Sequence, residues 1–141
     1  MSKKELNNFT GLASGNYSLP KSHILRGRRN FDRLFSHSQR ISSPTVNLRY
    51  SIYENPTEGY LVGFISKKKL GNAVKRTRIR RLMREAYRLN QHIIHDVYSP
   101  TAFGMHFVLM ANKAHASFDD IQKDVTTLLQ QLRTRLLQLN H

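Results

Sequence analysis

The chain has 141 residues and a mass of 16.4 kDa, the size of a single domain, and it contains no cysteine. The lack of cysteine excludes disulfide scaffolds, thiolate zinc sites and cysteine nucleophiles. Lysine and arginine total 23 against nine acidic residues, and the resulting charge of +14 favours a polyanionic partner. No apolar run approaches the ~18 residues that span a bilayer, and Met1–Tyr17 lacks the order of a signal peptide, so we expect a cytoplasmic protein.

Composition divides the chain into a tail and one domain. Residues 1–18 are polar, with scattered apolar residues and no periodicity, so we predict a disordered N-terminal tail followed by a domain over residues 19–141. Apolar residues at i, i+3 and i+4 predict a short helix over residues 28–37 with one buried side.

Two strands are expected next. Apolar and polar residues alternate over 46–53, which is typical of a strand with one covered face. Residues 60–66 are apolar on both faces, so we predict a second strand in the centre of the sheet. Pro56 and Gly59 mark a turn between the two strands, and we expect them to form a hairpin.

A long helix, a third strand and a final helix complete the domain. Asn72 is a suitable N-cap for a helix over 73–97, which ends before the Ser-Pro pair at 99–100. Residues 105–111 predict another central strand, and a continuous apolar stripe predicts a helix over 118–139. The order helix–strand–strand–helix–strand–helix predicts an α+β sandwich with a small sheet.

The most informative segment is residues 67–88, which holds ten of the 23 basic residues and a single acid, Glu85. On a helix, its apolar side chains gather on one side and arginines spaced four apart follow the other. Each such Arg–Arg pair destabilises an isolated helix by about 0.2–0.5 kcal/mol. Solvated surface helices usually interleave acids and bases, so we interpret this face as a surface for a phosphate backbone, which arginine contacts with paired N–H donors.

The same segment carries a family resemblance, which extends to Leu19-Pro20-Lys21 and to the predicted first helix and covers about residues 19–137. Thr77 stands where the family usually has asparagine; it keeps a hydroxyl group and lacks the amide. The segment resembles the arginine-rich signature of the bacterial ribonuclease P protein family at Leu70, Ala73, Arg76, Arg78, Ile79, Arg80, Arg81 and Arg84.

The resemblance implies a fold and a function. The fold is a small α/β sandwich whose arginine helix makes a left-handed crossover between parallel strands. The partner is ribonuclease P RNA, which uses Mg²⁺ to remove the 5′ leader from precursor tRNA, while the protein supplies no catalytic side chain and binds no metal tightly. We expect neither a membrane nor an obligate protein partner. The expected RNA-binding residues are Lys67, Lys68, Asn72, Arg76, Arg78, Arg80, Arg81, Arg84 and Arg88.

The resemblance also places the single-stranded leader in a cleft between the first helix and the sheet. Single strands bind to positive grooves with aromatic platforms, where each stacked base contributes about 1–3 kcal/mol. Phe31, Phe35 and Tyr50 are the aromatic candidates for this cleft. The alternative is that Phe31 and Phe35 only form the core stripe of a short helix.

Other chemistry is less well supported. His92 and His95 lie i, i+3 without an identified third ligand for zinc. Asp119 and Asp120 suit the positive end of the last helix, and Asp124 fits its polar face, so the residues do not indicate a nuclease cluster. We interpret the leucines of this helix as core rather than as a coiled-coil seam.

Three rival functions share some of these features. A ribosomal or RNA-chaperone protein would also carry a basic helix and a small sheet, and a specific RNA requirement in a cleavage assay separates it from the main interpretation. A stand-alone nuclease is disfavoured because no coherent acid or histidine cluster is present. A DNA-binding regulator is disfavoured because the arginine stripe lacks the Asn and Gln residues that read base edges.

Overall fold

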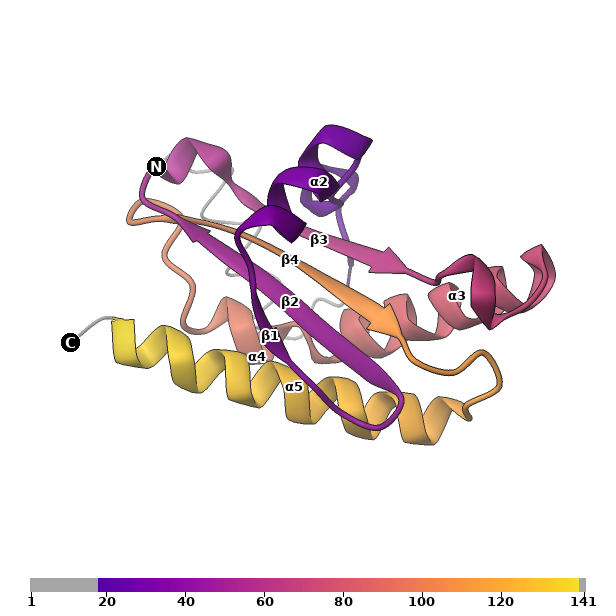
Figure 1. Ribbon diagram of the computed structural model, residues 1–141. Coiled ribbons are helices and arrows are strands. Elements are labelled where there is room, and N and C mark those ends of the chain that lie inside the picture. The colour runs from indigo at the N-terminus through magenta and orange to yellow at the C-terminus, as the bar shows by residue number, and fades with distance from the viewer. Residues whose placement is uncertain (1–17, 140–141) are drawn as a thin grey trace.

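The computed structural model describes residues 18–139, in which one mixed sheet of four strands separates helix α2 from helices α3, α4 and α5 (Figure 1). The predicted tail over residues 1–18 lies, except for Ser18, outside the described residues. The α-helices and strands are α2 (Arg28–Ser36), β1 (Gln39–Ile41), β2 (Val46–Tyr53), β3 (Tyr60–Ile65), α3 (Ala73–Asn90), α4 (His92–His95), β4 (Gly104–Ala111) and α5 (Phe118–Leu139), and the 3-10 turns are η1 (Lys21–His23), η2 (Pro56–Glu58) and η3 (Lys68–Leu70).

The strand order is β1-β2-β4-β3, and the predicted hairpin between β2 and β3 is wrong. Strand β4 lies between them, antiparallel to β2 and parallel to β3. The physical reason is burial: every residue of β4 except Met110 is buried, so this strand takes the centre, as predicted. The connection from β3 to its parallel neighbour β4 runs through α3 and α4.

Strand β3 lies beside β4 at one side of the sheet, so its predicted central position is also wrong. Its outer edge is covered in part by the chain before α2, where Ile24 forms a parallel bridge with Val62 and the Leu25 N–H donates to the Val62 carbonyl at 2.8 Å. Helices cover both of its faces, which explains why a strand in this position has an apolar sequence on both sides.

The remaining boundaries differ from prediction in two places. Strand β1 was not predicted because three residues are too few for a visible alternation. The helix predicted over 73–97 is divided at Gln91 into α3 and the short α4, and the Gln91 side chain donates a hydrogen bond to the Ser18 carbonyl at 2.8 Å. The α+β class, the other strands and the final helix are confirmed.

Two apolar clusters hold the layers together, and their sizes are unequal. The larger cluster fills the space between the sheet and α3 to α5, around residues such as Phe107 and Leu128. The smaller cluster lies under α2 and has only Leu25, Leu34 and Val108 fully buried. The short α2 covers only part of its side of the sheet (Figure 1), and polar and basic side chains of β1 and β2 line part of the uncovered face.

Candidate nucleic-acid interface

Helix α3 separates its residues into a buried and an exposed side, as the sequence predicts. The Asn72 side chain caps the helix by accepting a hydrogen bond from the Lys75 N–H at 3.0 Å. Ile79, Met83 and Ala86 are fully buried against the core. The opposite side carries the arginines, so packing energy from the apolar side holds in place a charged face that would be unstable alone.

Two of the predicted RNA-binding arginines are free to contact a ligand. Arg81 and Arg84 are exposed, and neither makes a hydrogen bond or ion pair to any residue within 18–139. Arg76 is half-buried, and its Nε has no hydrogen-bond partner among those residues. Lys67 and Lys68, before and at the start of η3, are exposed, as is Asn72.

Two other arginines of α3, Arg78 and Arg88, are engaged within the protein. Arg78 donates to the carbonyls of Ala114 and Ala116, at 3.3 Å each, and so ties α3 to the segment before α5. Arg88 pairs with Glu85 at 2.6 Å, and the hydrogen bond from Arg88 lowers the pKa of that carboxyl group. Both arginines therefore also serve the fold.

Arg80 is held by two hydroxyl groups. Its Nη1 donates to Ser66 Oγ at 2.6 Å, and its Nη2 reaches Thr77 Oγ1 at 3.3 Å. Ser66 in turn donates to the Arg76 carbonyl at 3.2 Å. Thr77, the residue that departs from the family pattern, thus supplies an acceptor that helps fix the direction of Arg80.

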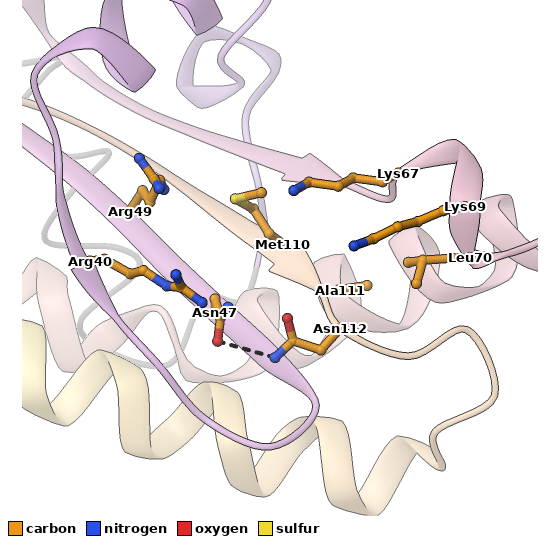
Figure 2. Close-up of a pocket in the computed structure, with 9 residues that line it drawn as sticks. All are labelled: Arg40, Asn47, Arg49, Lys67, Lys69, Leu70, Met110, Ala111 and Asn112. Carbon is orange, nitrogen blue, oxygen red and sulfur yellow. Dashed lines mark hydrogen bonds between the residues drawn. The ribbon is translucent and has the colours of Figure 1, made fainter.

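A second basic surface lies on the open face of the sheet and forms a shallow cleft. Lys67 and Lys69 reach into it from the end of β3 and from η3, toward Arg40 and Arg49 on strands β1 and β2 (Figure 2). No acidic side chain lines it. We call this the sheet-face cleft; it is lined by Arg40, Asn47, Arg49, Lys67, Lys69, Leu70, Met110, Ala111 and Asn112.

Two amides at the end of this cleft have fixed orientations. Asn112 Nδ2 donates to the Ser43 carbonyl at 2.9 Å and to Asn47 Oδ1 at 3.1 Å (Figure 2). Asn47 Oδ1 also accepts from the Ser43 N–H at 3.3 Å. With these atoms engaged, Asn47 Nδ2 keeps its donors and Asn112 Oδ1 its acceptor capacity for a ligand.

The aromatic candidates are divided between different surfaces. Phe35 is a half-buried residue of α2, and the Arg49 guanidinium lies 5.5 Å from its ring centroid, next to the sheet-face cleft. Tyr50 is not brought to this cleft. Period-two alternation turns it to the other face of the sheet, where it is 4% exposed and its hydroxyl donates to Gln39 Oε1 at 2.8 Å and accepts from Arg135 at 3.1 Å.

Phe31 lies in a second groove, between α2 and α3. This groove combines apolar residues with three arginines of α3. We call it the helix groove; it is lined by Ile24, Leu25, Phe31, Phe64, Thr77, Arg80, Arg81 and Arg84. Sequence reasoning assigned neither Phe64 to this groove nor Arg40, Asn47, Lys69 and Asn112 to the sheet-face cleft, because only strand order brings these segments together.

The residues considered for metal or nuclease chemistry have other environments. His95 is buried, with its ring centroid 4.9 Å from that of Tyr60, and burial lowers its pKa to about 3. Asp124 is buried rather than on a polar face, and its Oδ2 accepts from the Thr45 N–H at 2.9 Å and hydroxyl at 2.6 Å. Within residues 18–139, no three His, Asp or Glu side chains gather as metal ligands.

A mixed sheet flanked by a helix with a one-sided arginine face, beside two basic grooves, defines an RNA-binding protein. A family profile described as Ribonuclease P matches residues 19–133. The chain therefore belongs to the ribonuclease P protein family, and it is the protein subunit of an endoribonuclease holoenzyme that also contains RNA. None of the helices in residues 18–139 is long and apolar enough to cross a membrane.

Individual relatives agree with this membership. The ribonuclease P protein component of Chlorobaculum tepidum is 37% identical over 110 residues, which cover 74% of this chain and 71% of that protein. That of Clostridioides difficile is 30% identical over 105 residues, covering 74% and 87%. That of Syntrophus aciditrophicus is 40% identical over 74 residues, and the match spans 52% of this chain and 60% of the relative.

Solved structures share the fold. The RNase P protein of Staphylococcus aureus superposes with a TM-score of 0.62 at 19% identity, covering 79% of this chain and 96% of that one. The RNase P protein from Thermotoga maritima superposes with a TM-score of 0.61 at 22% identity, covering 77% and 96%. The sheet order and helix placement described above are therefore those of this family.

Proposed function

We propose that this chain binds ribonuclease P RNA along the arginine face of α3 and holds the 5′ leader of precursor tRNA in the sheet-face cleft. In this role it promotes endonucleolytic removal of the leader in the cytoplasm. The observation that carries the proposal is the pair of exposed arginines on α3, Arg81 and Arg84, which have no acidic partner among the described residues. Unneutralised guanidinium groups on a rigid helix are suited to phosphate oxygens.

The leader assignment is supported by the chemistry of the sheet-face cleft. Four cationic side chains can follow a sugar–phosphate backbone. The amides of Asn47 and Asn112 offer one donor group and one acceptor to a base edge, and Phe35 beside Arg49 offers a ring face at the border of the cleft. A single strand needs these three kinds of contact, whereas a duplex would present mainly its backbone.

The protein's contribution to cleavage is electrostatic and positional. Two polyanions repel each other, and a subunit of charge +14 lowers that repulsion when it lies between catalytic RNA and substrate. Holding the leader also fixes the scissile phosphate relative to the reacting groups. We assign the Mg²⁺ to the RNA, so no side chain of this chain takes a catalytic role in the proposal.

Reconstitution tests the proposal. Purified full-length protein and transcribed ribonuclease P RNA are combined at low Mg²⁺, and removal of the leader from a precursor tRNA is followed. Cleavage that needs both components and yields the mature 5′ end is the expected result. Binding of the RNA without any stimulation of cleavage would refute the processing role and favour the ribosomal or RNA-chaperone alternative.

The leader assignment has its own test, because it depends on one cleft. Arg49→Gln removes a charge from the cleft and the cation beside Phe35, while Arg135→Gln removes a charge on the opposite face of the sheet beside Tyr50. We expect Arg49→Gln to weaken binding of leader-bearing precursor tRNA to the holoenzyme and to leave binding of mature tRNA unchanged. Equal losses for both variants would contradict the assignment.

A further inference from the structure

We infer that the helix groove receives the base of an unpaired nucleotide of the catalytic RNA, so that α3 recognises a bulge or loop rather than a continuous duplex. The inference rests on the proposed function, since it assumes that the catalytic RNA lies along α3. It adds a binding site for one base and names Phe64 as the residue that makes it specific.

The floor of the helix groove is apolar and partly aromatic. Ile24, Phe31 and Phe64 are each half-buried, so each leaves part of its apolar surface open to the groove. Phe64 is supported from behind by Tyr87, whose ring centroid lies 6.0 Å away, and Phe31 rests directly above Gly63 of β3. Both rings are therefore braced by the fold and can act as rigid platforms.

The rim of the groove is cationic. Arg81 and Arg84 stand exposed along one side, and Arg80 is held beside them by Ser66 and Thr77. No acidic side chain lines the groove. An apolar floor next to guanidinium groups is complementary to a nucleotide, whose base is flat and apolar on its faces and whose phosphate is anionic.

Only an unpaired base fits both parts of this groove. A continuous duplex presents phosphates and sugars, which would contact the arginines and leave the rings of Phe31 and Phe64 without a partner. The leader strand is assigned to the sheet-face cleft, and the residues lining that cleft and those lining the helix groove do not overlap. The arginines of the groove belong to the face of α3 that the catalytic RNA covers, so the base comes from that RNA.

The experiment compares RNA binding by wild-type protein and Phe64→Leu, which keeps an apolar side chain and removes the ring. Loss of a stacked base corresponds to about 5–150-fold in affinity, and we expect Phe64→Leu to weaken binding of the catalytic RNA about fivefold or more. The dependence of affinity on salt concentration should keep its slope, because no phosphate contact is removed.

Three RNA probes identify the occupant. The first is a hairpin with one bulged purine, the second is the same hairpin fully paired, and the third is an unstructured oligonucleotide. Wild-type protein should prefer the bulged hairpin, and Phe64→Leu should abolish that preference. Equal affinity of wild-type protein for both hairpins would overturn the inference, and so would a loss confined to the unstructured oligonucleotide, which would assign the groove to the leader.

Controls separate this inference from folding and from the proposed function. Phe103→Leu makes the same change in a half-buried ring that packs against Tyr98, outside both grooves, and should leave RNA affinity unchanged. If circular dichroism shows that Phe64→Leu is unfolded, Phe31→Leu is tested in its place. Wild-type protein that supports leader removal while Phe64→Leu and Phe31→Leu bind the catalytic RNA normally would overturn the groove assignment and leave the proposed function intact.

Discussion

Replacing Gly63 by alanine tests how α2 is seated on the sheet. Gly63 is buried in β3, and a Cβ atom added there would lie 2.9 Å from Phe31 Cε1, 3.1 Å from Phe31 Cζ and 3.1 Å from Val108 Cγ1. The Val108 side chain is fully buried in the central strand, whereas the Phe31 ring borders an open groove. The added methyl group is therefore expected to push the Phe31 ring away from the sheet.

The size of the effect follows from two opposing contributions. Overpacking a core costs about 1–3 kcal/mol, and the lower end applies here because the Phe31 ring can move. Alanine also restricts the unfolded chain, which returns about 0.4–1 kcal/mol. We expect Gly63→Ala to lower the free energy of unfolding by roughly 0.5 kcal/mol, which for a domain of this size lowers Tm by about 2–3 °C.

A double-mutant cycle identifies the contact. Thermal unfolding is followed by circular dichroism for Gly63→Ala, Phe31→Leu and the double variant. Leucine is shorter than phenylalanine and leaves room for the new methyl group, so the double variant should be more stable than the sum of the single effects predicts. Strict additivity would refute the reasoning, because it would mean that the two positions do not share a contact.

The remaining predictions concern charge and buried polar groups. Arg81→Gln should reduce the slope of log affinity against log salt concentration for RNA binding by about 0.7–0.9. Arg88→Gln should reduce this slope less, because Glu85 already neutralises the Arg88 guanidinium. Equal slopes for the two variants would contradict this ranking. Burial lowers the pKa of His95 from 6.5 to about 3, so unfolding takes up a proton between these two pH values, and this group should lower stability by roughly 1 kcal/mol per pH unit as pH falls from 6.5 toward 3. In urea titrations, His95→Phe should reduce this pH dependence without abolishing it, because burial also lowers the pKa values of His23 and His106. Asp124→Ala should cost about 1–3 kcal/mol because it leaves the Thr45 N–H unpaired, and Asp124→Asn should cost less, as thermal melts can check.

Local patterns in the sequence predict where each helix and strand lies better than they predict which strands pair. Alternation and helical periodicity locate β2, α2 and α5 to within about one residue, because side-chain burial repeats along each of them, and a continuous apolar run locates the fully covered β4 equally well. The order of the strands in the sheet depends instead on which strand has apolar side chains to bury on both faces along its full length. The β2–β3 hairpin was expected from a short turn, but the burial of β4 places that strand between them.

The same distinction applies to the candidate site, where the pattern within one helix was predictable and the position of a residue relative to other elements was not. The arginine face of α3 follows from helical geometry alone, and the structure places Arg81 and Arg84 on an exposed surface. Tyr50 illustrates the limit, because an aromatic residue near a basic one in sequence says nothing about the face it occupies, and a shift of one residue reverses that face. Arg49, its neighbour, is the residue that points to the sheet-face cleft.

The arginines of α3 follow a regular spacing in the sequence, but they contribute differently to the stability of the folded protein. Arg78 donates to carbonyl groups in the segment before α5, and Arg88 is paired with an acid, so both stabilise the folded chain on their own. Arg81 and Arg84 have no such partner among residues 18–139, and their mutual repulsion opposes folding until phosphate groups neutralise them. Removing either of these two should therefore weaken RNA binding more than it weakens the fold, while Arg78 should show the reverse. The helix groove lies on the side of the two free arginines, which is why the binding of a base and the neutralisation of charge occur together there.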